Sequence, residues 1–298
     1  MSAAPRRLAV LGSPIAHSLS PALQQAAYRA LGLDWAYTAV EVGTGELDTF
    51  LDRLGPEWLG LSLTMPLKHE IQHRLTDLDR IAALTGAVNT VRFSDERLVD
   101  TPGQRRTLSG YNTDVPGLVR ALAEAGVERA SRVTLLGAGA TAASALVAAA
   151  ELGAEFVDVI ARTPRRAEAL EDLGRGLGLV VTISGLDAVD AADRESDLVI
   201  STLPGGTALP TEFPARLRAS IPLFDVGYAP WPSALASSWA AAGGTAHSGL
   251  SMLLHQALIQ VRIFVGDDPF QPLPEEATVL NAMRAALPAR PPGPAVEG

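Results

Sequence analysis

The chain of 298 residues contains no cysteine, which excludes disulfide bonds and metal sites built on thiolates. No stretch reaches about 18 uninterrupted strongly apolar residues, the length that a membrane-spanning helix needs. The chain also has no excess of basic over acidic residues, because its net charge is -9. An acidic chain of this kind is not expected to be a general binder of nucleic acid or of anionic membranes. These absences leave a globular protein that acts on small molecules, and no metal site is predicted.

Signal-peptide features are absent from the N-terminal sequence. Residues 1–7 lead directly into a strand-like run, Leu8–Leu11, without an apolar region and a cleavage site in front of it. Together with the absence of cysteine, this favours a cytoplasmic location.

Lysine is nearly absent as well. The chain has 23 arginines and a single lysine, Lys68. A guanidinium stays protonated in proteins, whereas an amine can exchange its proton once its pKa falls from about 10.4. The alternative is that an arginine-biased composition has left one lysine by chance. The motifs around Lys68 favour a chemical role.

Short apolar segments alternate with longer helical patterns, which indicates βαβ units and mainly parallel sheets. Strands are predicted at 6–11, 35–42, 59–63, 88–93, 132–136, 155–160, 179–183, 197–202, 222–226 and 245–247. Helices are predicted at 21–31, 45–54, 68–75, 115–125 and 249–265. A polar hairpin is expected at 97–110, with its turn at Pro102-Gly103, and a frayed tail from Ala289 onward.

Residues 132–142 have the pattern of a strand, a glycine-rich turn and a helix, and they fit G-x-G-x-x-A. Gly137 permits the tight turn, Gly139 lets the backbone approach a pyrophosphate, and Ala142 allows close packing. The helix N-terminus offers N–H groups to phosphates. The alternative is a tight turn without a ligand. The cofactor-binding residues predicted here are Gly137, Ala138, Gly139, Ala140, Thr141 and Ala142.

The next predicted strand is followed by a run of arginines. An NAD site expects a carboxylate near this strand end, whereas Arg162 and Arg166 offer guanidinium groups that pair well with a 2′-phosphate. NADP is therefore the predicted cofactor. Asp158 lies inside the strand and is expected to miss the ribose. The alternative is a solvated basic start of a helix.

Polar residues gather at five further places, each of which also has a purely structural explanation. Ser18 and Ser20 precede a helix and either hold a carboxylate or cap that helix, with Ser20 as N-cap. Pro66 ends a strand, so Lys68 is expected at the carboxyl end of the sheet, where α/β proteins bind ligands. The remaining segments are Gly86–Thr90, Tyr111–Asp114 and Gly249–Gln256.

In this order, and over nearly the whole chain, these segments resemble the shikimate dehydrogenase family, with Pro230–Pro232 and His255-Gln256 similar to its actinobacterial branch. The matching segments are Ser18-x-Ser20, Thr64-x-Pro66-x-Lys68, Gly86–Thr90, Asn112–Asp114, Gly137–Gly139, Ala161–Thr163 with Arg166, Asp225–Tyr228 and the helix of Gln256. The resemblance implies two α/β domains with a cleft between them. The first is a discontinuous substrate domain, residues 1–113 plus 249–298, and the second is a Rossmann NADP-binding domain, residues 114–248.

The resemblance also implies a reaction, the reversible NADPH-dependent reduction of 3-dehydroshikimate to shikimate on the route to chorismate and aromatic amino acids. It assigns acid–base catalysis to Lys68 paired with Asp114. The implied substrate-binding residues are Ser18, Ser20, Thr64, Asn89, Tyr228 and Gln256. The implied cofactor-binding residues are, besides the glycine-rich turn, Ala161, Arg162, Thr163, Arg166, Thr202, Gly249 and Met252. A homodimer is left open.

Three positions depart from the family pattern. Ser62 stands where the family often has Asn, Val115 where it usually has Gly, and Ala161 where it often has Asn. Competing functions are a quinate or aminoshikimate dehydrogenase of the same family, another two-domain NADP enzyme such as a methylene-tetrahydrofolate dehydrogenase, and a non-catalytic nucleotide sensor. The presence of Lys68 and Asp114 disfavours the sensor, and Ser rather than Thr at Ser18 mildly favours shikimate over quinate.

Overall fold

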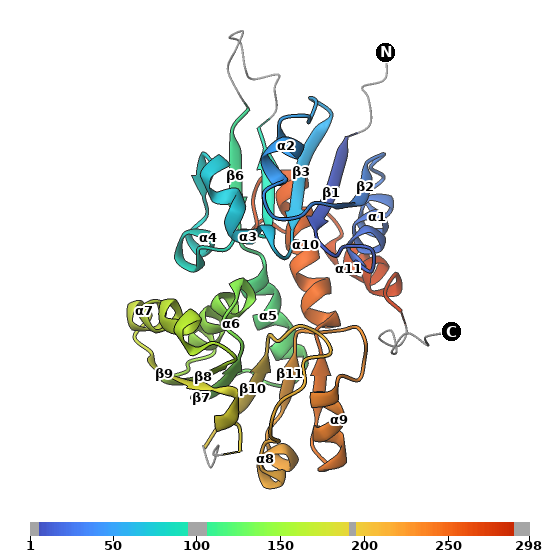
Figure 1. The fold of residues 1–298 in the computed structure, drawn as a ribbon. Coiled ribbons are helices and arrows are strands. Elements are labelled where there is room, and N and C mark those ends of the chain that lie inside the picture. The colour runs from blue at the N-terminus through green and yellow to red at the C-terminus, as the bar shows by residue number, and fades with distance from the viewer. Residues whose placement is uncertain (1–5, 95–105, 191–194, 289–298) are drawn as a thin grey trace, which may run out of the picture. The chain divides into compact units, whose positions relative to one another are not determined.

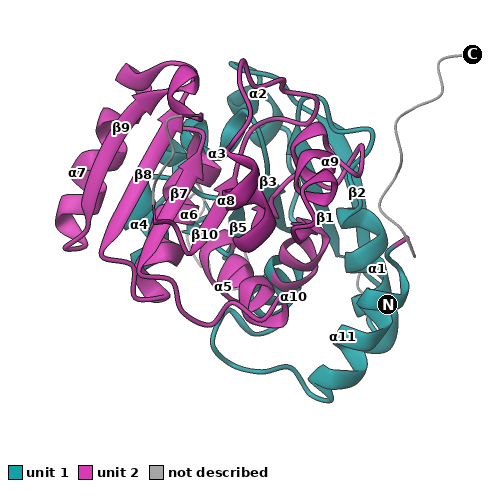
Figure 2. Cartoon of the chain, turned by 90° about the horizontal axis from the view of Figure 1, so that it is seen from below, with its two compact units in different colours: residues 1–113, 256–287 teal, residues 114–255, 288–298 magenta. Residues whose placement is uncertain are grey.

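A computed structural model describes residues 6–94, 106–190 and 195–288 of the chain (Figure 1). It divides into two compact units, which are shown in teal and magenta in Figure 2. Unit 1 comprises residues 1–113 and 256–287, and unit 2 comprises residues 114–255 and 288–298. The predicted first domain also included residues 249–255 and 288–298, which here fall in unit 2. The domain boundaries given from the sequence stay a prediction.

Unit 1 is built on a six-stranded mixed sheet with the strand order β2-β1-β3-β5-β6-β4. Its strands are β1 (Arg7–Gly12), β2 (Ala36–Glu41), β3 (Trp58–Leu63), β4 (Asp77–Leu78), β5 (Thr90–Phe93) and β6 (Leu108–Tyr111). Strand β1 runs parallel to β2 and β3, whereas β5 runs antiparallel to β3 and β6. The predicted turn at Pro102-Gly103 and the predicted tail lie outside the described residues.

Helices cover both faces of this sheet. They are α1 (Ser20–Ala30), α2 (Leu47–Leu51), α3 (Leu67–Glu70) with the 3₁₀ turn η1 (Ile71–Arg74), α4 (Arg80–Thr85), α10 (Leu250–Gly266) and α11 (Glu276–Ala285). Helix α10 lies so close to β3 that a Cβ on Gly60 would be 2.6 Å from a ring carbon of Phe264. The alternate residues Leu61 and Leu63 pack into the apolar core with Leu47 of α2. Because side chains alternate along a strand, Ser62 shares the Gly60 face of β3.

Unit 2 contains an all-parallel sheet with the order β12-β11-β10-β7-β8-β9. Its strands are β7 (Arg132–Leu136), β8 (Phe156–Ala161), β9 (Val180–Gly185), β10 (Leu198–Ser201), β11 (Leu223–Asp225) and β12 (Ala246–Ser248). All six confirm the predicted strands, with small shifts at their ends. Counted from β7, the order is the one that dinucleotide-binding sheets use. The strand order reverses between the neighbours β7 and β10, so ligands are expected beyond their carboxyl ends.

The helices of unit 2 are α5 (Asp114–Glu124), α6 (Ala140–Glu151), η3 (Pro164–Ala167), α7 (Glu168–Gly176), η4 (Leu186–Ala188), α8 (Ala215–Ser220) and α9 (Ala234–Ala241). Helix α6 packs against α5 and α7. Trp239 and Phe213 meet edge to face in the core, with ring centroids 5.2 Å apart. In the described part of the chain, no helix has both the length and the apolar character to cross a membrane.

Candidate active site

The loop after β1 carries Ser18 and Ser20. The Ser18 hydroxyl accepts a hydrogen bond of 3.3 Å from the backbone N–H of Ser20. Helix α1 begins at Ser20, its N-cap is Leu19, and no side chain caps it. The prediction that Ser20 is the N-cap is therefore wrong. Pro21 lacks an N–H, which leaves one amide fewer to satisfy in the first turn. The buried hydroxyl of Ser20 is thus not used to cap the helix.

The ends of β1 and β3 are tied together by backbone hydrogen bonds. Thr64 donates from its N–H to the carbonyl of Leu11 at 2.9 Å, and Ser13 donates to the carbonyl of Met65 at 3.0 Å. A Cβ on Gly12 would lie 2.8 Å from the Met65 carbonyl oxygen, so only glycine fits this approach. The loop that leads to Ser18 therefore starts beside the segment of Thr64.

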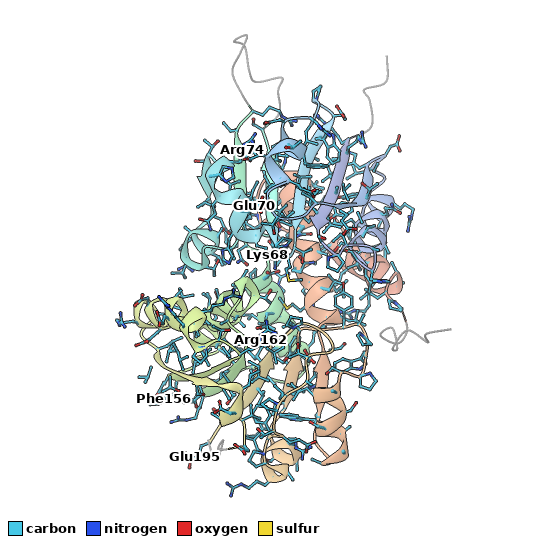
Figure 3. All side chains as sticks on the ribbon, viewed as in Figure 1. Lys68, Glu70, Arg74, Phe156, Arg162 and Glu195 are labelled. Atoms are coloured by element: carbon cyan, nitrogen blue, oxygen red, sulfur yellow. The ribbon has the colours of Figure 1, made fainter. Side chains whose placement is uncertain are left out.

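Lys68 follows at the start of α3, at the edge of unit 1 (Figure 3). Its backbone carbonyl accepts a hydrogen bond of 2.9 Å from the N–H of Val88. The next residue, His69, places Nδ1 2.6 Å from the carbonyl oxygen of Gly86. The segment 86–88 therefore holds α3 in place, and the residue that follows this segment is Asn89.

Asn89 is the centre of a buried polar cluster. Its Oδ1 accepts hydrogen bonds of 2.9 Å from the backbone N–H of Thr113 and from the hydroxyl of Thr90. Its Nδ2 donates to the Thr113 hydroxyl at 2.9 Å and to Oε1 of Gln256 at 3.4 Å. The structure thus brings Asn89 and Gln256, two predicted substrate-binding residues, into contact. Thr113 was quoted only as part of a motif, and its contact role is new.

A second set of bonds holds the segment that leads into α5. Asn112 donates from Nδ2 to the Thr85 hydroxyl and to the Ala87 carbonyl, both at 3.0 Å. Asp79 caps α4 by accepting from the Ala82 N–H at 2.6 Å, and it also accepts from the Asn112 N–H at 3.4 Å. Burial raises the pKa of the Asp79 carboxyl, and these two bonds partly offset the rise.

The effect is to fix the orientation of the chain just before Asp114. That residue follows Thr113 directly, begins α5, and is buried. Sequence reasoning did not single out Asp79. The available signal was an aspartate directly before a short helical segment, the usual position of an N-cap.

In unit 2, the glycine-rich turn joins β7 to α6. Gly137 has φ 113°, and a Cβ there would collide with the Thr202 hydroxyl. Thr202 itself, predicted to bind cofactor, donates a hydrogen bond of 2.8 Å to the carbonyl of Leu136. Gly139 is the N-cap of α6 without a side-chain cap, and a Cβ there would meet nothing within 4 Å. The turn therefore presents backbone N–H groups beside open space, which suits a pyrophosphate. Ala142 is fully buried.

Strand β8 ends at the buried Ala161. The arginine-rich run that begins with Arg162 follows it directly (Figure 3). Arg162, Thr163 and Arg166 are all exposed. Among the residues that the structure describes, neither arginine makes an ion pair. Asp158 lies inside β8 and accepts a hydrogen bond from Thr182 of β9, so this carboxylate is engaged within the sheet. The strand end thus offers an anion two unengaged guanidinium groups.

Three predicted residues of unit 2 lie near the ends of β11 and β12. Tyr228 is half-buried. Gly249 donates from its N–H to the carbonyl of Gly227 at 3.2 Å, and a Cβ on it would collide with the backbone of Val226. Close packing thus explains the glycine without a ligand. Met252, in the first turn of α10, is buried. No group of three potential metal-ligating side chains occurs in the described ranges.

Comparison with known proteins gives a consistent result. Residues 10–91 match the family model described as the shikimate dehydrogenase substrate binding domain. A shikimate dehydrogenase (NADP(+)) from Methanothermobacter thermautotrophicus is 34% identical over 283 residues, which cover 91% of this chain and 96% of that protein.

Solved structures are similar over most of their length. The shikimate dehydrogenase of Mycobacterium tuberculosis has a TM-score of 0.76 at 39% identity, and the match covers 94% of this chain and 100% of that one. The Thermus thermophilus enzyme, solved in complex with NADP(H) and shikimate, has a TM-score of 0.75 at 32% identity and is covered completely, with 95% of this chain. The likeness therefore spans both units.

Proposed function

Because the chain belongs to the shikimate dehydrogenase family, we propose that it catalyses the reversible reduction of 3-dehydroshikimate to shikimate with NADPH. In the forward direction the ring ketone takes up one hydride and one proton, and shikimate and NADP⁺ leave. The protein would act on the route to chorismate and aromatic amino acids. The observation that carries this proposal is the backbone tie between Lys68 and Val88, which joins the only lysine to the amide cluster of Asn89 and Gln256.

NADP fits the residues of unit 2. Bound there, it would supply the hydride equivalent for the ketone carbon. The N–H groups of the turn from Gly137 to Ala142 would hold the pyrophosphate, because the N-terminus of α6 carries a partial positive charge and no side-chain cap. Arg162 and Arg166, with Thr163, would hold the 2′-phosphate, because exposed guanidinium groups pair well with phosphate oxygens.

The acid–base step falls to Lys68. Its Nζ would give a proton to the oxygen that becomes the new hydroxyl and would take that proton back in the reverse reaction. Asp114 is the proposed partner that orients the amine. Lysine suits this role because its ammonium loses a proton far more readily than a guanidinium does.

The remaining polar residues would bind the substrate. Ser18 and Ser20 would hold the carboxylate, since their hydroxyls lie at the start of α1 and Ser20 does not cap it. The ring hydroxyls would be bound by Thr64, Asn89 and Gln256. Tyr228 and Met252 would complete the site as a polar edge and an apolar wall. The cytoplasmic location and a homodimer stay predictions from the sequence.

One assay tests the proposal. Initial rates are measured with purified protein for shikimate and for quinate, each with NADP and with NAD. We expect kcat/KM to be highest for shikimate with NADP. A clear preference for quinate would support the alternative within the same family, and no turnover of shikimate with either cofactor would overturn the proposed reaction.

A further inference from the structure

A continuous line of hydrogen bonds runs through the interior of unit 1 and ends at Asn89. Tyr37 donates from its hydroxyl to Ser62 at 2.7 Å, and Ser62 donates to Oε1 of Gln260 at 2.9 Å. Gln260 donates from Nε2 to the hydroxyl of Thr90 at 3.0 Å, and Thr90 donates to Oδ1 of Asn89 at 2.9 Å. These five residues come from β2, β3, α10, β5 and the position just before β5, and they are called the buried relay below.

Every member of the relay is removed from water. Tyr37 and Thr90 are 0% exposed, Gln260 and Asn89 2%, and Ser62 3%. Burial raises the pKa of Tyr37 well above the usual tyrosine value, so its hydroxyl stays a neutral donor. A buried polar group without a partner destabilises the fold, so each link constrains its neighbours.

The relay has a fixed direction. Oε1 of Gln260 accepts from Ser62 and also, at 3.1 Å, from Nε2 of Gln24. The Gln260 amide must therefore point its nitrogen toward Thr90, as it does. Because the Thr90 oxygen already accepts from Gln260, its O–H is free to donate a hydrogen bond to Oδ1 of Asn89.

The Thr90 hydroxyl, the last link of this relay before Asn89, is one of the donors that fix how the Asn89 amide is turned. The amide oxygen faces three donors, which are the Thr90 hydroxyl, the backbone N–H of Thr113 and, at 3.2 Å, the hydroxyl of Thr113. A backbone N–H can only donate, so the opposite orientation would set the NH₂ group against it. The nitrogen of Asn89 is accordingly turned toward Thr113 Oγ1 and Gln256 Oε1.

We propose that Gln260 is a positioning residue, which acts through Thr90 to keep Nδ2 of Asn89 presented as a donor to a ring hydroxyl of the substrate. The inference rests on the proposed function, because the substrate role of Asn89 belongs to that proposal. Gln260 lies one helical turn after Gln256 on α10, so one helix supplies both a substrate-binding amide and the amide that orients its partner.

A first experiment tests the orientation without any turnover. The chain has only three asparagines, at 89, 112 and 281, so protein labelled with ¹⁵N-asparagine gives three side-chain amide pairs. In Gln260→Met, which keeps the side-chain length and removes the donor, we expect the Asn89 pair to shift or broaden. The Asn281 pair should stay in place.

The matched control is Thr134→Val in unit 2, which removes an equally buried hydroxyl that lies 2.6 Å from the Ser196 hydroxyl. It should leave the Asn89 signals unchanged. Thr90→Val breaks the next link of the relay and should reproduce the Gln260→Met spectrum, which keeps the test decisive if Gln260→Met does not fold. Unchanged Asn89 signals in the folded relay variants would overturn the proposal.

A second experiment tests the link to catalysis with a double-mutant cycle. Gln260→Met should raise the shikimate KM about tenfold, the effect of one lost hydrogen bond in the bound state, while the NADP KM changes less than about twofold. In an Asn89→Ala background, Gln260→Met should add almost nothing, because its effect passes through Asn89. Fully additive losses would show that Gln260 only supports packing and would reject the proposal. A wild-type protein without activity on shikimate would instead overturn the proposed function, and the amide spectra would still decide the role of Gln260.

Discussion

The backbone N–H of Val88 donates a hydrogen bond of 2.9 Å to the backbone carbonyl of Lys68. This bond joins the first turn of α3 to the residue before Asn89, so the only lysine and the buried amide lie on segments that cannot shift independently. His69 adds a second tie at the Gly86 carbonyl. A proton donor contributes to a reaction only when it is held at the reacting atom, and these two ties hold the backbone that carries the proposed donor.

The first prediction concerns this lysine. Lys68→Ala should lower kcat by at least about a hundredfold, the low end for lost acid–base catalysis. Lys68→Arg should be similarly slow, because a guanidinium keeps the positive charge but does not release its proton. Steady-state kinetics with shikimate and NADP measure both variants. The thermal unfolding temperature of both variants should be almost the same as that of the wild type, since Lys68 is only half-buried. Near-normal turnover in either variant would reject the assigned role.

The second prediction concerns Asp114. Asp114→Asn removes the negative charge proposed to orient the amine and should lower kcat by about a hundredfold. Glu128→Gln is the matched control, since it makes the same carboxylate-to-amide change at an exposed position of unit 2 and should leave the kinetics alone. Equal effects of the two changes on kcat would remove Asp114 from the mechanism.

The third prediction separates NADP from NAD. Arg162→Gln should raise the KM for NADPH about tenfold, because one charge-assisted hydrogen bond to the 2′-phosphate is lost. The shikimate KM should change much less. With NAD, which has no 2′-phosphate, variant and wild type should behave alike. Arg175→Gln on α7 is the control, because Arg175 pairs with Asp172 at 2.8 Å and should not contact the cofactor. A loss that is equal for both cofactors would contradict the assignment.

The sheet of unit 2 could be predicted strand by strand because parallel strands buried on both faces appear as short, nearly continuous apolar runs. Val133–Leu136 is such a run, and the glycine-rich turn follows it directly. Strand β4, by contrast, has only two residues, both exposed, and no pattern to detect. Helix α11 was also missed, because its N-cap, Glu275, has φ 50° and makes no side-chain cap. Its first residue is instead held by Arg262, whose Nε lies 2.7 Å from Glu276.

A sequence motif names candidate site residues, but it gives no sign of roles that depend on contacts between distant parts of the chain. Ser20 has the residue type of an N-cap, yet α1 begins at that residue, so local preference alone gave the wrong function for it. Gln260 has no local signal that sets it apart from the other polar residues on a mostly apolar helix. Its bond to Ser62 joins residues 198 positions apart, and only the packing of α10 on β3 brings them together.

The last prediction concerns pH and the buried carboxyl of Asp225. Its Oδ2 accepts a hydrogen bond of 2.7 Å from the hydroxyl of Ser233, and its Oδ1 accepts one of 3.1 Å from the N–H of Gly227. Ser233 in turn caps α9 by accepting from the Ala236 N–H at 3.0 Å. Burial raises the pKa of Asp225 above its ordinary value of 3.8, and the hydrogen bonds offset part of the rise.

Because the pKa of Asp225 is raised on folding, the folded state binds this proton more tightly than the unfolded state does. The resulting stability is fully present below the unfolded pKa and is lost as the pH rises through the folded pKa. Asp225→Asn cannot titrate at this position. Urea titration of the wild type and the variant, from about pH 3.5 to pH 7, gives the free energy of unfolding of each. The wild-type value minus the variant value should be largest at the acidic end and should shrink as the pH rises. A difference that stays constant, or that grows toward pH 7, would contradict the raised pKa.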